Sequence, residues 1–266
     1  MRTAAILPVK RFPIAKQRLG ESVADSLRAD LARAMVGDVL NALRECPALD
    51  ATIVVTCESS VASAARYIGA IVVEDSAEEG QSAAVSLGLA RALQDGFERA
   101  LCIPGDCPTL DPSELTALLA AGVPGGNVGD TPAASAMRAE RAFASSASAS
   151  ASEVVIVPDR HGSGTNGLLL CPPDALSPSF GPDSRARHER LAGEAGASWR
   201  IERPASLLLD IDTGEDLAVL RERLARERVR APRTRAVLGR SDTNERRSEP
   251  DESAGTASAG RSSQAA

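Results

Sequence analysis

Aromatic residues, paired cysteines and long hydrophobic runs are all scarce in this 266-residue chain. Aromatic residues make up 2% of it, which leaves little for stacking on nucleic-acid bases. Its five cysteines form no C-x-x-C pair, so we expect neither a disulfide framework nor a structural zinc site. No apolar run approaches the roughly 18 residues that span a bilayer, and no secretory leader precedes the first apolar stretch. We therefore expect a cytoplasmic protein with no membrane and no nucleic-acid partner.

Lysine is the scarce member of the basic residues. Lysine and arginine together number 30, yet Lys10 and Lys16 are the only lysines, in a chain whose net charge is −6. Ammonium and guanidinium groups are not interchangeable at phosphates. Because like charges repel, the cluster of Lys10, Arg11, Lys16 and Arg18 indicates an anionic ligand such as a triphosphate. A solvated basic loop is the alternative, and the chain has no Walker A motif.

Short apolar runs alternate with amphipathic stretches along most of the chain. Strands are expected at 4–9, 53–56, 71–73, 101–103, 154–157, 168–171 and 207–209. Helices are expected at 22–46, 61–68, 81–94 and 213–228, and helix starts at 111 and 181. This alternation predicts an α/β fold with a mostly parallel sheet and helices on both faces.

Two segments interrupt this pattern. Residues 122–152 are rich in Gly, Pro, Ala and Ser, and we interpret them as a mobile low-complexity insertion in a single domain spanning 1–230. Residues 231–266 are rich in Ser, Arg and Glu with few large apolar side chains, which predicts a disordered tail.

Carboxylates follow two of the expected strands. Asp106 comes after the strand at 101–103, and Asp210 and Asp212 come directly after the strand at 207–209. Residues two apart on a strand face the same side, and a divalent cation removes the repulsion between adjacent carboxylates. Carboxylate oxygens suit Mg²⁺, so the three aspartates are candidate metal ligands. The alternative is that Asp212 or Thr213 caps the following helix.

Three further segments are candidates for binding small anions or a base. Residues 161–166 place two glycines among hydroxyl and amide donors, as an anion nest or a plain hairpin turn would. Residues 180–184 open a helix whose amides can bind phosphate or carboxylate. Gly80 and Gln81 open the helix at 81–94, where Gln81 offers both a donor and an acceptor to a purine edge or simply forms a surface turn. The only histidines, His161 and His188, lie beside no recognisable nucleophile, so a catalytic triad is not expected.

Taken in order, five of these segments resemble the 2-phospho-L-lactate/phosphoenolpyruvate guanylyltransferases of deazaflavin coenzyme F-420 biosynthesis. They are LPVKR…AKQRL from Leu7, GDCP from Gly105, PDRHGSGTN from Pro158, FGPDSRARH from Phe180 and LDIDT from Leu209. The resemblance covers residues 3–222 without the insertion, and it implies a Rossmann-like, three-layer nucleotidyltransferase fold. Ser163 stands where the family usually has threonine, and Gln81-Ser82 where many members have leucine–asparagine.

The resemblance also implies an activity and a site. Such enzymes join the phosphate of a three-carbon acid to the guanylyl group of GTP with Mg²⁺ and release pyrophosphate. By analogy, the catalytic cations are Lys10, Lys16 and Arg18, and the metal ligands are Asp106, Asp210 and Asp212. The acid would meet Thr165, Gly181 and Ser184, and the nucleotide phosphates would meet the loop that contains Lys10, Lys16 and Arg18. From the residues themselves we also expect Arg11, Gly80 and Gln81 to bind the nucleotide.

The sequence leaves alternatives for the acid substrate, the oligomeric state and the function. The acid is either phosphoenolpyruvate or 2-phospho-L-lactate, with an arginine- and alanine-heavy composition favouring the first by association. The oligomeric state is open, a homodimer included. The alternatives in function are a nucleotidyltransferase that acts on a sugar phosphate or a molybdopterin, and a GTP-binding regulator without turnover.

Overall fold

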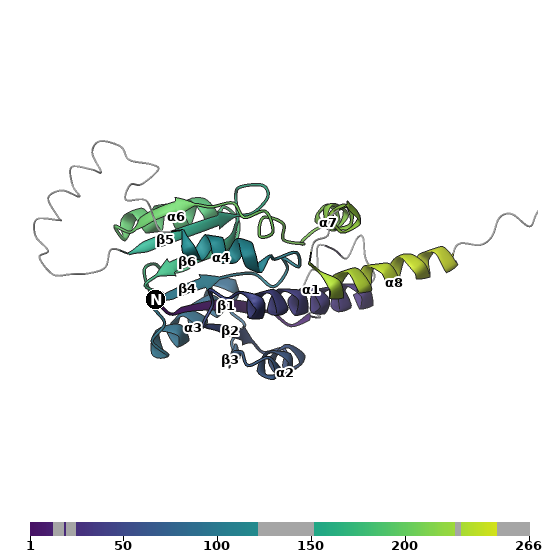
Figure 1. Cartoon of the computed structure of the whole chain (residues 1–266), viewed down its shortest axis with the longest axis horizontal. Helices are drawn as coiled ribbons and strands as arrows, with labels where there is room; N and C mark the ends of the chain where they lie inside the picture. The colour runs from purple at the N-terminus through teal and green to yellow at the C-terminus, as the bar shows by residue number, and fades with distance from the viewer. Residues whose placement is uncertain (13–18, 20–24, 122–151, 227–229, 249–266) are drawn as a thin grey trace, which may run out of the picture.

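The computed structural model describes residues 1–12, 19, 25–121, 152–226 and 230–248, and Figure 1 shows their arrangement. The strands are β1 (Thr3–Val9), β2 (Ala51–Thr56), β3 (Ile71–Val73), β4 (Arg99–Cys102), β5 (Glu153–Pro158), β6 (Thr165–Cys171) and β7 (Ser198–Ile201). The helices are α1 (Asp25–Glu45), α2 (Ser59–Tyr67), α3 (Gln81–Gln94), α4 (Pro112–Ala120), α6 (Ser184–Glu194), α7 (Gly214–Arg226) and α8 (Pro232–Ser248). The expected insertion at 122–152 lies almost wholly outside the described residues.

The seven strands form one mixed sheet in the order β3-β2-β1-β4-β6-β5-β7. Strands β3, β2, β1 and β4 run parallel to one another, and β5 runs parallel to β7. Strand β6 lies antiparallel to both β4 and β5. The predicted α/β fold with a mostly parallel sheet is therefore confirmed, and the carboxyl ends of β1, β2, β3 and β4 meet at one edge.

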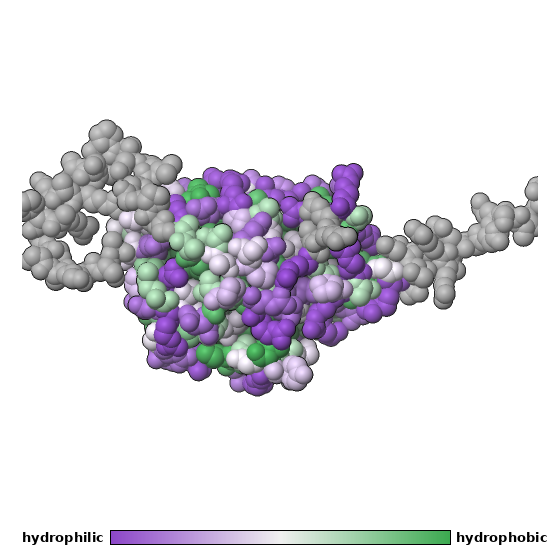
Figure 2. Space-filling view, in the orientation of Figure 1, coloured by the Kyte–Doolittle hydropathy of each residue, from purple (hydrophilic) through white to green (hydrophobic). Residues whose placement is uncertain are grey.

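Helices cover both faces of the sheet because its central strands bury side chains on both sides. Along β1, Leu7 packs in a cluster with residues of α1, α2 and α4, whereas Ile6 packs in a second cluster with residues of α3 and α6. Both side chains are fully buried. The result is three layers, helix on sheet on helix. On the face drawn in Figure 2, hydrophobic residues form small scattered areas among hydrophilic ones.

A third apolar cluster lies beside the sheet and corrects the expectation of a disordered tail from residue 231. Residues 232–248 form α8, which packs on α1 and buries Val237 and Leu238. The carboxylate of Asp38 on α1 accepts hydrogen bonds from the backbone amides of Arg233 (3.1 Å) and Thr234 (2.9 Å) and so caps α8. The cap lies 195 residues away in sequence, so the local composition of 231–248 gave no sign of it.

The expected strand at 207–209 is also wrong. The structure has turns and a bend at 205–208, and the carbonyls of Leu207 and Leu208 accept hydrogen bonds from the side chain of Asn166 instead of from a strand. Strand β7, which pairs with β5, was not expected from the sequence. None of the helices in the described part of the chain is long and apolar enough to cross a bilayer.

Candidate active site

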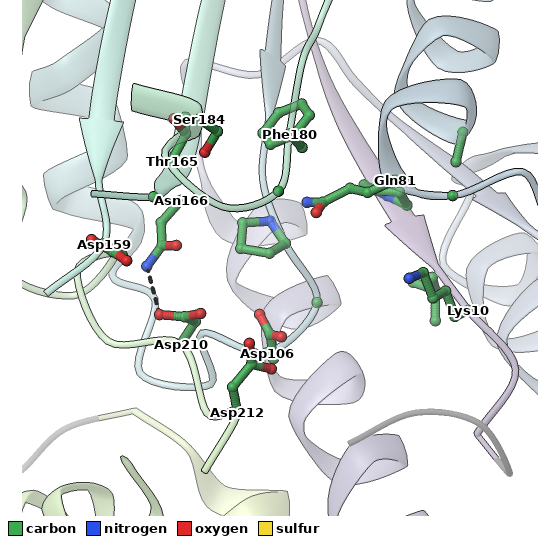
Figure 3. A pocket seen from close by; sticks show the side chains of 18 of the residues that line it. Lys10, Gln81, Asp106, Asp159, Thr165, Asn166, Phe180, Ser184, Asp210 and Asp212 are labelled. Carbon is green, nitrogen blue, oxygen red and sulfur yellow. Dashed lines mark hydrogen bonds between the residues drawn. The ribbon is translucent and has the colours of Figure 1, made fainter. Parts of the chain in front are cut away.

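A cavity of about 740 Å³ opens at the carboxyl edge of β1 and β4. A volume of this order accommodates a small-molecule ligand with most of its surface buried. Most of the residues predicted from sequence line it: Lys10, Gly80, Gln81, Asp106, Thr165, Gly181, Ser184, Asp210 and Asp212. Figure 3 shows Thr165 and Ser184 at the upper left of the cavity, Lys10 and Gln81 at its right, and the three aspartates below them.

Unlike Lys10, the other three predicted basic residues are not among the described residues that line the cavity. Lys16 and Arg18 lie outside the described residues, so the structure does not place them. Arg11 is exposed and does not line the cavity; its Nε lies 3.2 Å from a carboxylate oxygen of Glu78, which does. Arg11 therefore ties the loop after β1 to the loop before α3.

Buried and cavity-facing side chains alternate along residues 209–212, although this segment is not a strand. Leu209 and Ile211 are buried in the third apolar cluster, and the aspartates on either side of Ile211 point the other way, into the cavity. The backbone amide of Ile211 donates to the carbonyl of Asp106 at 3.1 Å. This bond joins the loop after β4 to the 209–212 segment, so that the three aspartates line the same cavity.

The environment of Asp210 opposes its negative charge. Burial raises the pKa of Asp210 to about 6, and the nearby carboxylates of Asp106 and Asp212 add to the increase. Asn166 partly offsets these effects by donating a hydrogen bond of 3.1 Å to the Asp210 carboxylate. A carboxylate kept in such a place at neutral pH is typical of a site that receives a cation.

The oxygen donors fit Mg²⁺ in kind, but the described residues contain no ready metal cluster. Among them, no group of three or more His, Cys, Asp or Glu side chains lies close enough to hold a metal ion. All three aspartates line the same cavity and stay candidate ligands. Mg²⁺ usually takes only one or two carboxylates and completes its shell with substrate phosphates and water.

The alternative of a helix cap is confirmed for Thr213 and not for Asp212, because Thr213 and Asp216 cap α7. The Asp216 carboxylate accepts from the amide of Thr213 (2.8 Å), and the Thr213 hydroxyl accepts from the amide of Asp216 (3.2 Å). Asp216 also accepts from the amide of Asp212 at 3.2 Å and pairs with Nε of Arg160 at 2.8 Å. This buried carboxylate thus links the turn after β5 to the backbone of a candidate metal ligand.

The 179–184 loop carries two of the predicted acid-binding residues. The Arg187 guanidinium donates to the carbonyls of Ser179 (3.0 Å), Phe180 (3.1 Å) and Pro182 and so holds the loop in place. Gly181 has φ +111°, a conformation that a side chain would strain. Ser184, 1% exposed, is the last residue of this loop and the first residue of α6.

Thr165 contacts a residue that sequence reasoning left unassigned. Its hydroxyl lies 3.0 Å from Nδ1 of His188, which is fully buried. Burial, with the nearby charge of Arg187, lowers the pKa of His188 to about 4. Sequence reasoning gave no site role to Arg160 or Asp216 and included Asn166 only as an amide donor of the 161–166 turn; the placement of Arg160 beside this Gly-rich turn after a strand could have pointed to it.

Gly80 and Gln81 lie where α3 begins, and Gln81 is on the Lys10 side of the cavity (Figure 3). Gly80 is the N-cap of α3 with φ +109°, and no side chain caps this helix. The helix approaches the sheet closely, because a Cβ on Gly88 would lie 2.3 Å from Cγ2 of Ile6 on β1. Close packing therefore fixes the position of the first turn of α3 at the cavity.

The fold and the site together define a nucleotidyltransferase-like α/β protein. A nucleotidyl transferase from Methanothermobacter superposes with a TM-score of 0.55 at 17% identity, covering 85% of this chain and 98% of that one. A CMP:2-keto-3-deoxy-manno-octonic acid synthetase with CTP gives 0.50 at 11% identity, covering 85% and 99%. The family model for the MobA-like NTP transferase domain matches residues 18–169.

Relatives found by sequence narrow the family further than the structural neighbours do. The phosphoenolpyruvate guanylyltransferase of Conexibacter woesei is 46% identical over 90% of this chain and 96% of its own. That of Streptomyces coelicolor is 34% identical over 90% and 97%. The 2-phospho-L-lactate guanylyltransferase of Methanothermobacter thermautotrophicus is 30% identical over 82% and 83%. The chain belongs to the phosphoenolpyruvate/2-phospho-L-lactate guanylyltransferase family.

Proposed function

We propose that this protein is a guanylyltransferase that joins GTP to phosphoenolpyruvate in the biosynthesis of coenzyme F-420. A phosphate oxygen of the acid attacks the α-phosphorus of GTP, the bond from that phosphorus to the β-phosphate oxygen breaks, and pyrophosphate leaves. The product is enolpyruvyl-diphospho-guanosine. The attacking oxygen is already an anion, so the reaction needs no strong general base.

The observation that carries this proposal is the order of groups across one cavity. Thr165 and Ser184 lie on one side, Lys10 and Gln81 on another, and the carboxylates of Asp106, Asp210 and Asp212 form a third side that faces the same space (Figure 3). We assign the acid to Thr165, Gly181 and Ser184. We assign the nucleotide to Lys10, Lys16, Gly80 and Gln81. This order sets the reacting phosphates at the carboxylates, where two polyanions must be brought into line.

The three aspartates would hold Mg²⁺ together with phosphate oxygens. When bound there, the ion neutralises charge on the reacting phosphates. Lys10, Lys16 and Arg18 would neutralise the charge that develops on the leaving pyrophosphate. Asn166 orients the Asp210 carboxylate, and Asp216 fixes the backbone at Asp212.

Phosphoenolpyruvate is favoured over 2-phospho-L-lactate by the relatives. The 46%, 34% and 36% identical proteins carry the first name, whereas the relative with the second name is 30% identical. The chain's own cavity supports a small phosphorylated acid through its hydroxyl and amide donors.

The test is product analysis by mass spectrometry, with pyrophosphate release measured in parallel. The purified chain is incubated with GTP, Mg²⁺ and either acid, and with hexose phosphates as a control. We expect a guanosine diphospho-adduct and pyrophosphate with phosphoenolpyruvate. Turnover of hexose phosphates alone would assign a sugar nucleotidyltransferase, and GTP binding without turnover of any acid would assign a regulator; either result overturns the proposal.

A further inference from the structure

His188 is a buried titratable side chain that contacts Thr165 in the lining of the cavity, and the proposed chemistry does not use it. It lies on α6 with no exposed surface, and both ring nitrogens have partners. Nε2 is 2.9 Å from the backbone nitrogen of Ser179, and Nδ1 is 3.0 Å from the hydroxyl oxygen of Thr165. The ring of Phe180 packs against it in an edge arrangement, with centroids 5.1 Å apart.

These two contacts fix which nitrogen carries the proton. A backbone N–H only donates, so Nε2 must accept from Ser179 and therefore carries no proton. A neutral imidazole then carries its proton on Nδ1 and donates it to Thr165. The neutral state is consistent with burial, which lowers the pKa of His188 to about 4.

The protonation of His188 determines whether the Thr165 hydroxyl acts as a hydrogen-bond donor or acceptor toward the cavity. Its oxygen accepts from Nδ1, so its own proton is left to donate, and Thr165 lines the cavity. If the hydroxyl proton were instead given to the imidazole, Thr165 would present lone pairs to the cavity and repel an anion. A hydroxyl held as a donor suits a ligand oxygen that only accepts, such as one of a phosphate or carboxylate.

We propose that His188 is a positioning residue that sets the Thr165 hydroxyl as a hydrogen-bond donor to an anionic oxygen of the acid substrate. This inference rests on the proposed function. His188 touches no ligand itself, and it is not a general base, because Nε2 is occupied by Ser179 and Nδ1 already holds its proton. The role explains why a fully buried histidine follows the anion-binding loop.

Two substitutions separate the contacts of His188. In His188→Asn, the amide nitrogen takes the place of Nδ1 and keeps a donor for Thr165, but the acceptor for Ser179 is lost. In His188→Gln, the amide oxygen takes the place of Nε2 and keeps the acceptor for Ser179, but the donor for Thr165 is lost.

We expect His188→Gln to raise the KM for phosphoenolpyruvate roughly ten-fold or more, since a hydrogen bond to a charged group is lost. His188→Asn should stay within about three-fold, and the KM for GTP should stay within about two-fold in both.

A Thr165→Val background supplies the control. If His188 acts through Thr165, adding His188→Gln to Thr165→Val should raise the KM for the acid by less than about two-fold more. Equal effects of His188→Asn and His188→Gln, or additive effects in the Thr165→Val background, would mean that His188 only supports the 179–184 loop, and would overturn the inference.

A measurement on the unsubstituted protein keeps the test independent of variant folding. The chain has two histidines, so ¹⁵N-histidine labelling gives two imidazole systems, and His161→Asn assigns them. At pH 7 we expect the Nδ1-protonated neutral form for His188. The Nε2-protonated form, or the imidazolium, would overturn the inference. Absence of turnover with either acid would instead overturn the proposed function and leave this tautomer result standing.

Discussion

At the scale of single residues, the site holds a carboxylate in a place that costs the folded protein stability. Asp210 is partly buried beside two other carboxylates, and its pKa is raised from 3.8 to about 6. Because the folded state binds a proton more readily than the unfolded chain, charged Asp210 destabilises the metal-free protein at neutral pH. Such a residue is retained for its chemistry and at a loss of stability.

Asp210→Asn should therefore stabilise the metal-free protein while abolishing turnover. With EDTA at pH 7.5, we expect its free energy of unfolding to rise by roughly 1–3 kcal/mol, since the pKa increase bounds the gain. The folded pKa lies above the unfolded one, so the difference from wild type is full above pH 6 and fades as the pH falls to about 4. Urea unfolding across this range measures it. Asp174→Asn, at an exposed aspartate, is the control, and a less stable Asp210→Asn would contradict the account.

Part of the site could be predicted from single residues and part could not. Lys10 and Asp106 follow β1 and β4, and the rule that ligands bind beyond strand ends placed them in one cavity. Asp210 also lines it, although the segment before it is not a strand. The role of His188 could not be predicted, because it depends on Ser179 and Thr165 at distances set by the fold. The contact of Asp216 with Arg160 is likewise visible only in three dimensions.

At the scale of elements, the start of α7 serves both as a helix cap and as a support for the 209–212 segment. Asp216→Ala removes the cap of α7 and leaves Arg160 without its buried partner, so we expect a loss of about 2–4 kcal/mol in stability. The loss of the bond to the amide of Asp212 should also weaken Mg²⁺ binding in the presence of GTP.

Glu215→Gln is the matched control for Asp216→Ala. Glu215 also pairs with Arg160, at 3.0 Å, but its side chain is 74% exposed, and exposed pairs contribute about 0–1 kcal/mol. Thermal unfolding and Mg²⁺ titration of turnover measure both variants. If Glu215→Gln lost as much as Asp216→Ala, the buried link would have no special role.

The packing of α3 on β1 provides a second test at this scale. In Gly88→Ala the new Cβ would lie 2.3 Å from Cγ2 of Ile6, a side chain in the middle of the sheet. We expect a loss of about 1–3 kcal/mol from overpacking. The displaced helix carries Gly80 and Gln81, so the KM for GTP should rise more than the KM for the acid.

Gly193→Ala on α6 is the control, since nothing lies within 4 Å of its added Cβ. Alanine is the better helix former, so this change should be neutral or stabilise by about 0.5–1 kcal/mol. Calorimetric melting of both variants compares the two glycines. Equal tolerance at both positions would show that α3 shifts without strain.

At the scale of the whole molecule, the sequence predicted the layers but not the packing at the edges. Alternating apolar runs and amphipathic stretches were sufficient for the central strands, because each of these is buried on both faces. Strand β7, which carries Arg200 and Trp199, and helix α8 were missed because their stabilising partners lie far away in sequence. Segment 207–209 was misassigned because buried leucines occur equally in a turn that a side chain such as Asn166 supports.

Helix α8 connects these edges to the active site through the third apolar cluster. Leu238 packs in the same cluster as Leu209 and Ile211, which lie directly behind the cavity carboxylates. Leu238→Ala should lower stability by about 2–4 kcal/mol, the usual loss for a buried leucine. Arg240→Ala, at an exposed position on the same helix, should stay within about 0.5 kcal/mol.

The same variant tests whether α8 is part of the catalytic unit. Because Leu209 and Ile211 keep their other neighbours, Leu238→Ala should leave both KM values near wild type at 20 °C. Its activity should then fail at a temperature several degrees lower, together with the loss of tertiary structure. Activity assays and circular dichroism over one temperature series measure the two events. If Leu238→Ala melted like Arg240→Ala, α8 would be an appendage that unfolds apart from the sheet, and the support of the carboxylate segment would rest on α1 and α7 alone.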